Sequence, residues 1–337
     1  MKAWRLTAGA SSLDDLTMIE ADKPEPGPGE VLVRVRACSL NYRDQMIVKG
    51  QYFGGTIAQD LTPLSDGAGV VEAVGEGVTG YQPGDRVAGT FFQNWLAGPP
   101  NPAPGVALGA PPAKGMLSEY VTLPERGVVR LADSLSFDQA ATLPCAGVTA
   151  WNALMEGRHA VGPGRSVLVL GTGGVSLLAL ALAKAAGALV IATSSSDEKL
   201  ARIRALGADE TINYRTTPDW GAAAASLTGG IDHVVEVGGA GTLQQSMTAV
   251  GFNGEVALIG VLTRQGETAP HALMLKGASL RGIFVGSAAM ATALNRAIDA
   301  TGIEPAIGRV FAFDEARQAY EYQSSPDLFG KVVIRID

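Results

Sequence analysis

Residues 166–200 read SVLVLGTGGVSLLALALAKAAGALVIATSSSDEKL, and this stretch decides the fold. The apolar run 167–170 predicts a buried strand, which leads into the glycine turn 171–174 and a helix of small and aliphatic residues. A second apolar run, 189–192, predicts another strand. Such a βαβ unit binds a dinucleotide, because glycines let the backbone approach a pyrophosphate and the helix N-terminus offers free N–H groups. We therefore expect a nicotinamide coenzyme to bind at Gly171, Gly173, Gly174 and Val175.

Length and composition set the broad class. At 337 residues the chain is longer than one typical domain, and 47% hydrophobic residues allow a sizeable core. No run of about 18 uncharged apolar residues predicts a membrane span, and residues 1–20 lack the apolar region of a secretory signal. A net charge of −7 with scattered basic residues argues against nucleic-acid binding. Cys38 and Cys145 do not make a disulfide framework, so we expect a cytoplasmic protein.

The first part of the chain, residues 1–122, reads as strands and turns, of which the alternating run 30–37 is the clearest strand. Residues 98–112 hold six of the eighteen prolines, which excludes helix and central strand there. We expect a surface lobe or lid in this segment. It would be ordered where Phe91, Phe92 and Trp95 anchor it.

From about residue 123 strands and helices alternate, which predicts an α/β fold with a parallel, doubly wound sheet. The expected strands cover 166–171, 189–193, 210–213, 232–236, 254–259 and 279–285. Residues 288–337 hold two predicted helices, 289–301 and 313–323, and a last strand, 331–336, which we expect to return to the first domain. The predicted domains are 1–122 with 288–337, and 123–287.

The end of the second strand of the βαβ unit bears on the choice of coenzyme. An NAD site places an acidic residue there to bind the ribose 2′-hydroxyl, and residues 191–196 contain none. A carboxylate would repel a 2′-phosphate by about 4 kcal/mol at about 4 Å. Ser194 and Ser195 can instead donate to phosphate oxygens, and Lys199 adds positive charge, so we expect NADPH. Alternatively, or in addition, Ser195 caps the next helix together with Glu198.

Several motifs together resemble the medium-chain dehydrogenase/reductase superfamily over essentially the whole chain. They are PGPGEVLVRVRACSLNYRD (26–44), DGAGVVEAVGEGV (66–78), PGDRV (83–87), LPCAGVTAW (143–151), GTGGVS (171–176) and EKLARIRALGADETINY (198–214). Within the superfamily the chain resembles the zinc-independent, quinone-oxidoreductase-like branch. This resemblance implies a mostly-β, GroES-like substrate domain and a Rossmann coenzyme domain.

The metal ligands of the zinc alcohol dehydrogenases are incomplete here. Asn41 stands at the position of the first cysteine, Ser65 stands at that of the histidine, and only Cys145 matches. One thiolate with an amide and a hydroxyl cannot make a zinc site. The segment 91–115 has no cysteine for a structural zinc, and His159, His233 and His271 lie far apart in sequence. We therefore predict no zinc.

Hydride transfer needs no metal if the acceptor is electrophilic or if hydrogen bonds polarise its oxygen. By resemblance, Asn41 points at the nicotinamide side of the cleft and Tyr52 lines the substrate entrance. Either Tyr42 or Tyr52 could donate a hydrogen bond or a proton to the developing oxyanion or enolate. Core packing is the alternative for Tyr42. Asp44, in the same stretch, is a further candidate for a direct role in the chemistry, and the alternative is that it orients Arg43 or a backbone turn.

The resemblance implies further coenzyme contacts. Thr149 matches a family position that contacts the nicotinamide, and Tyr214 matches one that packs beside the adenosine 2′-phosphate. Lys331 matches a terminal lysine that lies near the ribose or the phosphates. The remaining positions follow the fourth and fifth strands or match backbone that holds the carboxamide: Val237, Gly238, Val261, Leu262, Ile283, Phe284 and Val285. For the apolar residues in this set, the alternative to a coenzyme contact is ordinary packing at the strand ends.

The predicted function is that of an NADPH-dependent oxidoreductase acting on quinones, aldehydes, ketones or conjugated enones. An alcohol dehydrogenase working toward oxidation and a non-catalytic NADPH-binding protein remain as alternatives. The apolar strand 279–285 would lie at the sheet edge, where it can pair with a second chain. In the resembling family this strand forms a dimer, so we expect a homodimer.

Overall fold

The computed structural model describes residues 1–100, 107–260, 262–263 and 265–337. The chain folds into two compact units, Met1–Val148 with Gly286–Asp337, and Thr149–Val285. The predicted boundary lay at 122/123, whereas the first unit keeps residues 123–148. The reason is that strand β7 (Val128–Arg130) pairs with β5 (Arg86–Gly89) of the same unit.

Over the described residues, the second unit contains a six-stranded sheet in the order β10-β9-β8-β11-β12-β13, with all neighbours parallel. This is the order of two mononucleotide-binding halves joined at β8 and β11, which confirms the predicted doubly wound sheet. The strands are β8 (Ser166–Leu170), β9 (Leu189–Ser194), β10 (Glu210–Asn213), β11 (Ile231–Glu236), β12 (Val250–Leu258) and β13 (Ser279–Gly282). All six predicted strands are present, but β12 begins four residues earlier than predicted and β13 ends three residues earlier.

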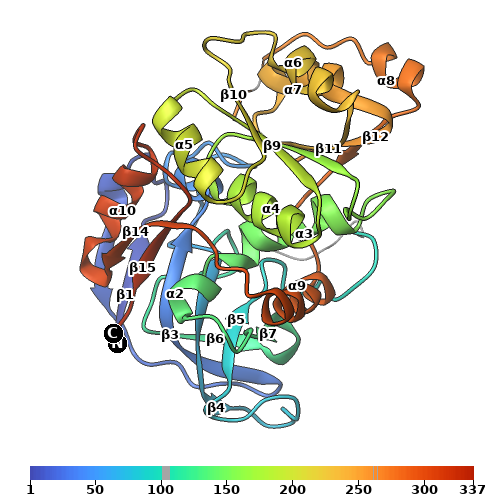
Figure 1. Ribbon diagram of the computed structural model, residues 1–337. Coiled ribbons are helices and arrows are strands. Elements are labelled where there is room, and N and C mark those ends of the chain that lie inside the picture. The colour runs from blue at the N-terminus through green and yellow to red at the C-terminus, as the bar shows by residue number, and fades with distance from the viewer. Residues whose placement is uncertain (101–106, 261, 264) are drawn as a thin grey trace. The chain divides into compact units, whose positions relative to one another are not determined.

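Helices connect these strands (Figure 1). The helix α4 packs on β8 and β9, α5 packs on β9 and β10, and α6 lies beside α7, which contacts β11 and β12. Since parallel connections are right-handed and the two halves of the sheet grow in opposite directions, α4 and α7 cover opposite faces. The helices are α3 (Val148–Met155), which begins at the unit boundary, α4 (Gly174–Ala185), α5 (Asp197–Ala205), α6 (Trp220–Thr228), α7 (Ala240–Ala249) and α8 (His271–Lys276).

The first unit is built on the long strand β3 (Glu30–Leu40), which pairs antiparallel with three others. Its described part contains two sheets. The larger has seven strands: six follow the order β14-β15-β3-β4-β5-β7, and the seventh, β6, pairs with β3 outside that path. The smaller is the two-stranded sheet β1-β2. The pairing of β15 with β3 confirms that the last strand returns to the first domain. The remaining strands are β1 (Lys2–Leu6), β2 (Leu16–Glu20), β4 (Asp66–Val74), β6 (Tyr120–Pro124), β14 (Ile307–Ala312) and β15 (Lys331–Arg335).

The reading of residues 1–122 as strands and turns missed one helix, α1 (Tyr42–Val48). This helix has only seven residues and little apolar periodicity, so the sequence pattern gives no signal for it. The two predicted C-terminal helices are present as α9 and as a short turn with α10. The other helices and turns are α2 (Phe137–Ala140), α9 (Ala288–Thr301), α10 (Ala316–Gln323), the 3₁₀ turns Leu13–Asp15, Glu125–Gly127 and Phe313–Glu315, and a π-helical turn at Leu143–Gly147.

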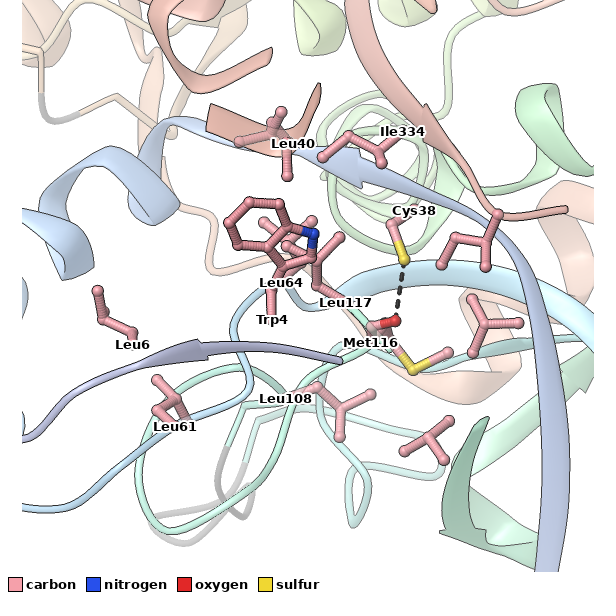
Figure 2. Packing of buried hydrophobic residues seen from close by; sticks show 14 of the residues in the cluster. Trp4, Leu6, Cys38, Leu40, Leu61, Leu64, Leu108, Met116, Leu117 and Ile334 are labelled. Carbon is pink, nitrogen blue, oxygen red and sulfur yellow. Dashed lines mark hydrogen bonds between the residues drawn. The ribbon is translucent and has the colours of Figure 1, made fainter. Parts of the chain in front are cut away.

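A core of large aliphatic side chains fills the first unit, and Figure 2 shows part of it. Leu40 and Leu64 belong to this core, and Cys38 Sγ donates a hydrogen bond to the Met116 carbonyl oxygen at 3.0 Å. Because Leu40 and Leu64 are buried, they fix the backbone positions of the residues that follow them.

The proline-rich segment is only partly the surface lobe that the sequence predicted. Phe91, Phe92 and Trp95 are buried, as expected of its anchors. Residues 107–110 are also buried, with Leu108 in the core, so this part is not a lid; residues 101–106 lie outside the described residues. None of the helices in the described part of the chain is long and apolar enough to cross a bilayer.

Candidate functional site

The glycine turn 171–174 joins β8 to α4 in the second unit. Gly171 has a φ of 73°, which favours glycine, and Gly173 is the N-cap of α4. A Cβ atom added to Gly171 or Gly173 would meet no heavy atom within 4 Å. The turn is therefore open above the N-terminus of a twelve-residue helix, where Gly174 and Val175 begin, and a pyrophosphate fits such a place.

Ser176 replaces the third glycine of the G-x-G-x-x-G pattern. Its side chain is buried, and Oγ donates to the carbonyl oxygen of Leu170 at 2.7 Å. The hydroxyl thus ties the first turn of α4 to the end of β8, so the missing glycine does not disturb the turn.

At the end of β9, three serines have different surroundings. Ser194 is buried and its Oγ accepts from the backbone N–H of Ser196 at 3.3 Å, whereas Ser195 is partly exposed. The N-cap of α5 is Ser196, whose Oγ accepts from the Lys199 N–H at 3.3 Å. The alternative that Ser195 caps this helix with Glu198 is therefore wrong.

Tyr214 lies next to these serines. Asn213 pairs with Ser194 in the parallel register, and the Tyr214 N–H donates to the Ser194 carbonyl oxygen at 3.1 Å. The Tyr214 side chain is 42% exposed. The first carboxylate after β9, Asp197, accepts from Asn213 Nδ2 at 2.7 Å.

A buried carboxylate that the sequence analysis missed holds the loop after β11. Glu236 accepts hydrogen bonds from the N–H groups of Gly238 (2.7 Å) and Gly239 (2.9 Å), and from the hydroxyls of Thr242 (2.6 Å) and Ser246. The predicted positions Val237 and Gly238 therefore lie in a fixed loop. Leu262, after β12, is half exposed, and Val261 lies outside the described residues.

The residues after β13 are held by α3. Val285 has a φ of 55°, which is strained for a β-branched residue. Its carbonyl oxygen accepts from Asn152 Nδ2 at 2.7 Å, and Arg281 Nη1 donates to Asn152 Oδ1 at 2.9 Å. Sequence reasoning gave no signal for Asn152 or Arg281. Of the other predicted positions nearby, Thr149 and Ile283 are buried and Phe284 is half exposed.

In the first unit, Asn41 follows the end of β3 and is the N-cap of α1. Its backbone N–H donates to Asp44 Oδ2 at 2.7 Å. Asp44 is buried, which raises the pKa of its carboxyl to about 6, although the Arg43 charge and the Asn41 N–H oppose this rise. The carboxylate thus orients a backbone turn, which was the alternative to a chemical role.

The amide of Asn41 belongs to a set of buried polar residues, here called the Lys331 network: Lys331, Asn41, Ser65 and Asp66. Lys331 Nζ donates to Asn41 Oδ1 and to the Leu40 carbonyl oxygen, both at 2.6 Å, and lies 3.6 Å from Asp66 Oδ2. Ser65 Oγ donates to Asp66 Oδ1 at 2.7 Å and lies 3.5 Å from Asn41 Nδ2. The resemblance assigned Lys331 to the coenzyme, and no sequence signal pointed to its bond with Asn41.

The two predicted tyrosines differ in exposure. Tyr42 is 48% exposed, so the alternative that it packs in the core is wrong. Tyr52 is partly buried, which raises the pKa of its hydroxyl. The Arg43 guanidinium lies 5.0 Å from the Tyr52 ring centroid and 4.7 Å from that of Phe91, and Nη1 donates to the Leu108 carbonyl oxygen at 2.6 Å.

The residues at the zinc-ligand positions do not fit a zinc ion. Burial raises the pKa of the Cys145 thiol, and its backbone N–H donates to Asp66 at 3.2 Å. Asn41 Oδ1 already accepts from an ammonium ion, which would repel a divalent cation. Within the described ranges, no three His, Cys, Asp or Glu side chains gather as metal ligands.

Comparison with known proteins identifies both parts of the chain. Residues 27–133 match the alcohol dehydrogenase GroES-like domain, and residues 174–299 match the zinc-binding dehydrogenase family. A zinc-type alcohol dehydrogenase-like protein of Schizosaccharomyces pombe is 46% identical, over 97% of both chains. A quinone oxidoreductase of Sus scrofa is 30% identical, over 88% of this chain and 86% of its own.

A solved structure described as an NAD-dependent alcohol dehydrogenase superposes with a TM-score of 0.89 at 33% identity, covering 100% of both chains. The matches confirm the predicted combination of a GroES-like domain with a Rossmann sheet, and with it a nicotinamide-dependent oxidoreductase. The chain therefore belongs to the medium-chain dehydrogenase/reductase superfamily.

Proposed function

We propose that the protein is an NADPH-dependent, zinc-independent oxidoreductase that reduces quinones, aldehydes, ketones or conjugated enones. The observation that carries this proposal is the Lys331 network, in which the Asn41 amide and the Ser65 hydroxyl stand at two positions where zinc relatives have metal ligands, and the Lys331 ammonium ion donates to that amide. Such a site offers N–H and O–H donors to a substrate oxygen. Donors of this kind stabilise the negative charge that develops when a carbonyl or enone accepts hydride.

Gly171, Gly173, Gly174 and Val175 would hold the coenzyme, which when bound would supply hydride to an electrophilic carbon of the substrate, so that negative charge would develop on the substrate oxygen. Asn41 donates a hydrogen bond to this oxygen. Tyr42 or Tyr52 donates a hydrogen bond or the proton that completes the reduction. Asp44 positions Asn41 by accepting its backbone N–H.

The tyrosine assignment is tested with Tyr42→Phe and Tyr52→Phe. The variant that lacks the proton donor should lose about a hundredfold or more in kcat, as expected for a general acid. Tyr322→Phe is a control, because the Tyr322 hydroxyl bonds only to Asp327 in the described structure. Unchanged kcat in both variants would remove the tyrosines from the mechanism.

The preference for NADPH is proposed from the hydroxyls of Ser194 and Ser195, the charge of Lys199 and the neighbouring Tyr214. Asp197 weighs against it only weakly, because Asn213 holds its carboxylate. The NAD-dependent relative described above shows that either coenzyme must be tested. We expect a lower KM and Kd for NADPH than for NADH, and tighter use of NADH would refute this preference.

A substrate panel tests the function as a whole. We expect NADPH consumption with quinones, aldehydes or enones, measured by the loss of absorbance of the reduced coenzyme. Oxidation of alcohols with NADP⁺ as the main activity would instead favour the alcohol dehydrogenase reading. Coenzyme binding without turnover would favour a non-catalytic protein, and stoichiometric tightly bound zinc would contradict zinc independence.

We also propose a homodimer formed through β13. This strand is at the edge of the parallel sheet, and its Leu280 is 41% exposed. An edge strand offers unpaired backbone groups to a second copy. Light scattering should give twice the chain mass of 34.7 kDa, and a monomeric mass would reject the dimer. A cytoplasmic location stays a prediction.

A further inference from the structure

The register of the first sheet places a buried positive charge beside Asn41. In the antiparallel pair of β15 and β3, Val332 stands opposite Leu40, so Lys331 comes next to Asn41 although 290 residues separate them. The Lys331 side chain is 4% exposed and that of Asp66 is fully buried. A buried ammonium ion is retained only when it is paired and hydrogen-bonded, and here two carbonyl oxygens and a carboxylate surround it.

The chemistry of these groups determines which way the Asn41 amide faces. An ammonium ion has three donors and no acceptor, so the amide must turn Oδ1 toward Lys331 and Nδ2 away from it. Ser65 gives its hydroxyl hydrogen to Asp66, which leaves the serine oxygen as an acceptor on the side of Nδ2. The donors therefore run in one direction, from Lys331 to Asn41, Ser65 and Asp66, and the Asp66 carboxylate faces the ammonium ion again.

This direction leaves one amide hydrogen available. Nδ2 carries two hydrogens, and among the residues that the structure describes its acceptor is Ser65 Oγ, at the long distance of 3.5 Å. Asn41 is 9% exposed, so the residue is buried but not fully enclosed. A charge-assisted bond at Oδ1 also polarises the amide and makes the N–H groups better donors.

We propose that Lys331 is a positioning residue that orients and polarises the Asn41 amide, so that its free N–H donates to the substrate oxygen during hydride transfer. This inference rests on the proposed function and narrows it to substrates that react through an oxyanion or enolate. Asn41 keeps its hydrogens throughout, and the proton that completes the reduction comes from another donor. Lys331 then acts on the substrate through Asn41, and it is not the coenzyme ligand that the resemblance implied.

A double-mutant cycle of Lys331→Met and Asn41→Leu tests this proposal. Removing a single oxyanion donor costs about 10²–10³ in kcat. We expect each single variant to lose on the order of a hundredfold in kcat, and the double variant to lose no more than Asn41→Leu alone, because the lysine then has nothing to act on. The Kd for NADPH, measured by fluorescence titration, should stay within about twofold of the wild-type value. Lys23→Met, which removes an exposed lysine paired with Glu72, is the matched control.

Two results would overturn the proposal. The first is a further loss from Lys331→Met in the Asn41→Leu background as large as in the wild type. The second is an increased Kd for NADPH with unchanged kcat in Lys331→Met, which would mean that Lys331 binds the coenzyme. Lys331→Met alone could fail to fold because Asp66 is left unpaired. In that case the double variant Lys331→Met/Asp66→Asn, which removes both charges, replaces Lys331→Met in the cycle, and Asp66→Asn replaces the wild type as the reference.

A crystal structure separates this proposal from the proposed function. If the wild type reduces no substrate of the panel, the proposed function fails, but the orientation of the amide can still be examined. We expect Asn41 Nδ2 to remain turned away from Lys331 in the wild type and to lose this fixed orientation in Lys331→Met. An amide that faces Lys331 with Nδ2, or that keeps one orientation in both proteins, would overturn the inference by itself.

Discussion

The glycine turn 171–174 and the Lys331 network differ in how their surroundings are packed. Around Gly171 and Gly173 the backbone borders open space at the N-terminus of α4. In the Lys331 network the polar groups are buried and hydrogen-bonded to one another. The comparison indicates that the open turn suits the approach of a ligand, whereas the buried network suits the orientation of one side chain by fixed partners. Changes at the first region should affect ligand affinity, and changes at the second should affect stability and kcat.

The largest expected effect is on coenzyme affinity, from Ser195→Asp. A carboxylate about 4 Å from the 2′-phosphate costs about 4 kcal/mol, or about a thousandfold in Kd. We expect the Kd for NADPH to rise toward this limit, while that for NADH and the melting temperature change little. Ser195→Asn, which has the same shape without the charge, is the control. An unchanged Kd for NADPH would mean that the 2′-phosphate binds elsewhere.

The second prediction concerns the pH dependence of stability around the Lys331 network. Folded Asp44 has a pKa of about 6, above its ordinary value of 3.8, so the folded protein binds this proton more tightly than the unfolded chain does. Its stabilising contribution is full below about pH 4 and is lost as the pH rises through 6, a change of about 3 kcal/mol. Asp44→Asn should therefore become more stable relative to the wild type between pH 4 and 7, as measured by urea unfolding. A difference that does not change with pH would contradict the raised pKa.

The third prediction separates affinity from stability at the glycine turn. Gly173→Ala adds a methyl group into open space, so it causes no clash, and the melting temperature should fall only by the modest amount that alanine costs at an N-cap. The same methyl group would stand where the pyrophosphate approaches, and we expect the coenzyme Kd to rise about a hundredfold, or about 2.7 kcal/mol. Gly162→Ala also fills open space but lies before β8, and it should leave the Kd unchanged. Equal Kd values for both variants would place the coenzyme outside the turn.

The smallest expected effect distinguishes two adjacent serines. Ser196→Ala removes the N-cap of α5 and should cost about 1 kcal/mol in the free energy of unfolding. Ser195→Ala should leave stability unchanged and weaken NADPH binding instead. Thermal unfolding and coenzyme titration of the two variants measure both quantities, and a loss of stability in Ser195→Ala alone would reverse the assignment.

The parts of the fold that were predictable have strong local signals. The βαβ unit follows from apolar runs and glycines within 35 consecutive residues, and the six strands of its sheet were found within a few residues of their observed ends. Helix α1 and the burial of residues 107–110 could not be predicted from local patterns. The helix is short, the segment is rich in proline, and both are fixed by packing against the surrounding core. The same holds for Asn152, whose bond to the Val285 carbonyl oxygen spans 133 residues.

The sequence by itself predicted the parallel sheet with its glycine turn, because the order of residue types along a short stretch carries that information. The resemblance to the family, and not the residue order, was what indicated that the set of zinc ligands is incomplete. Only the tertiary structure decided that Lys331 bonds to Asn41, that Ser196 rather than Ser195 caps α5, and that Tyr42 is exposed. The physical reason is that a hydrogen bond depends on distances of a few tenths of an ångström. Strand register and core packing fix such distances between residues that the sequence does not place together.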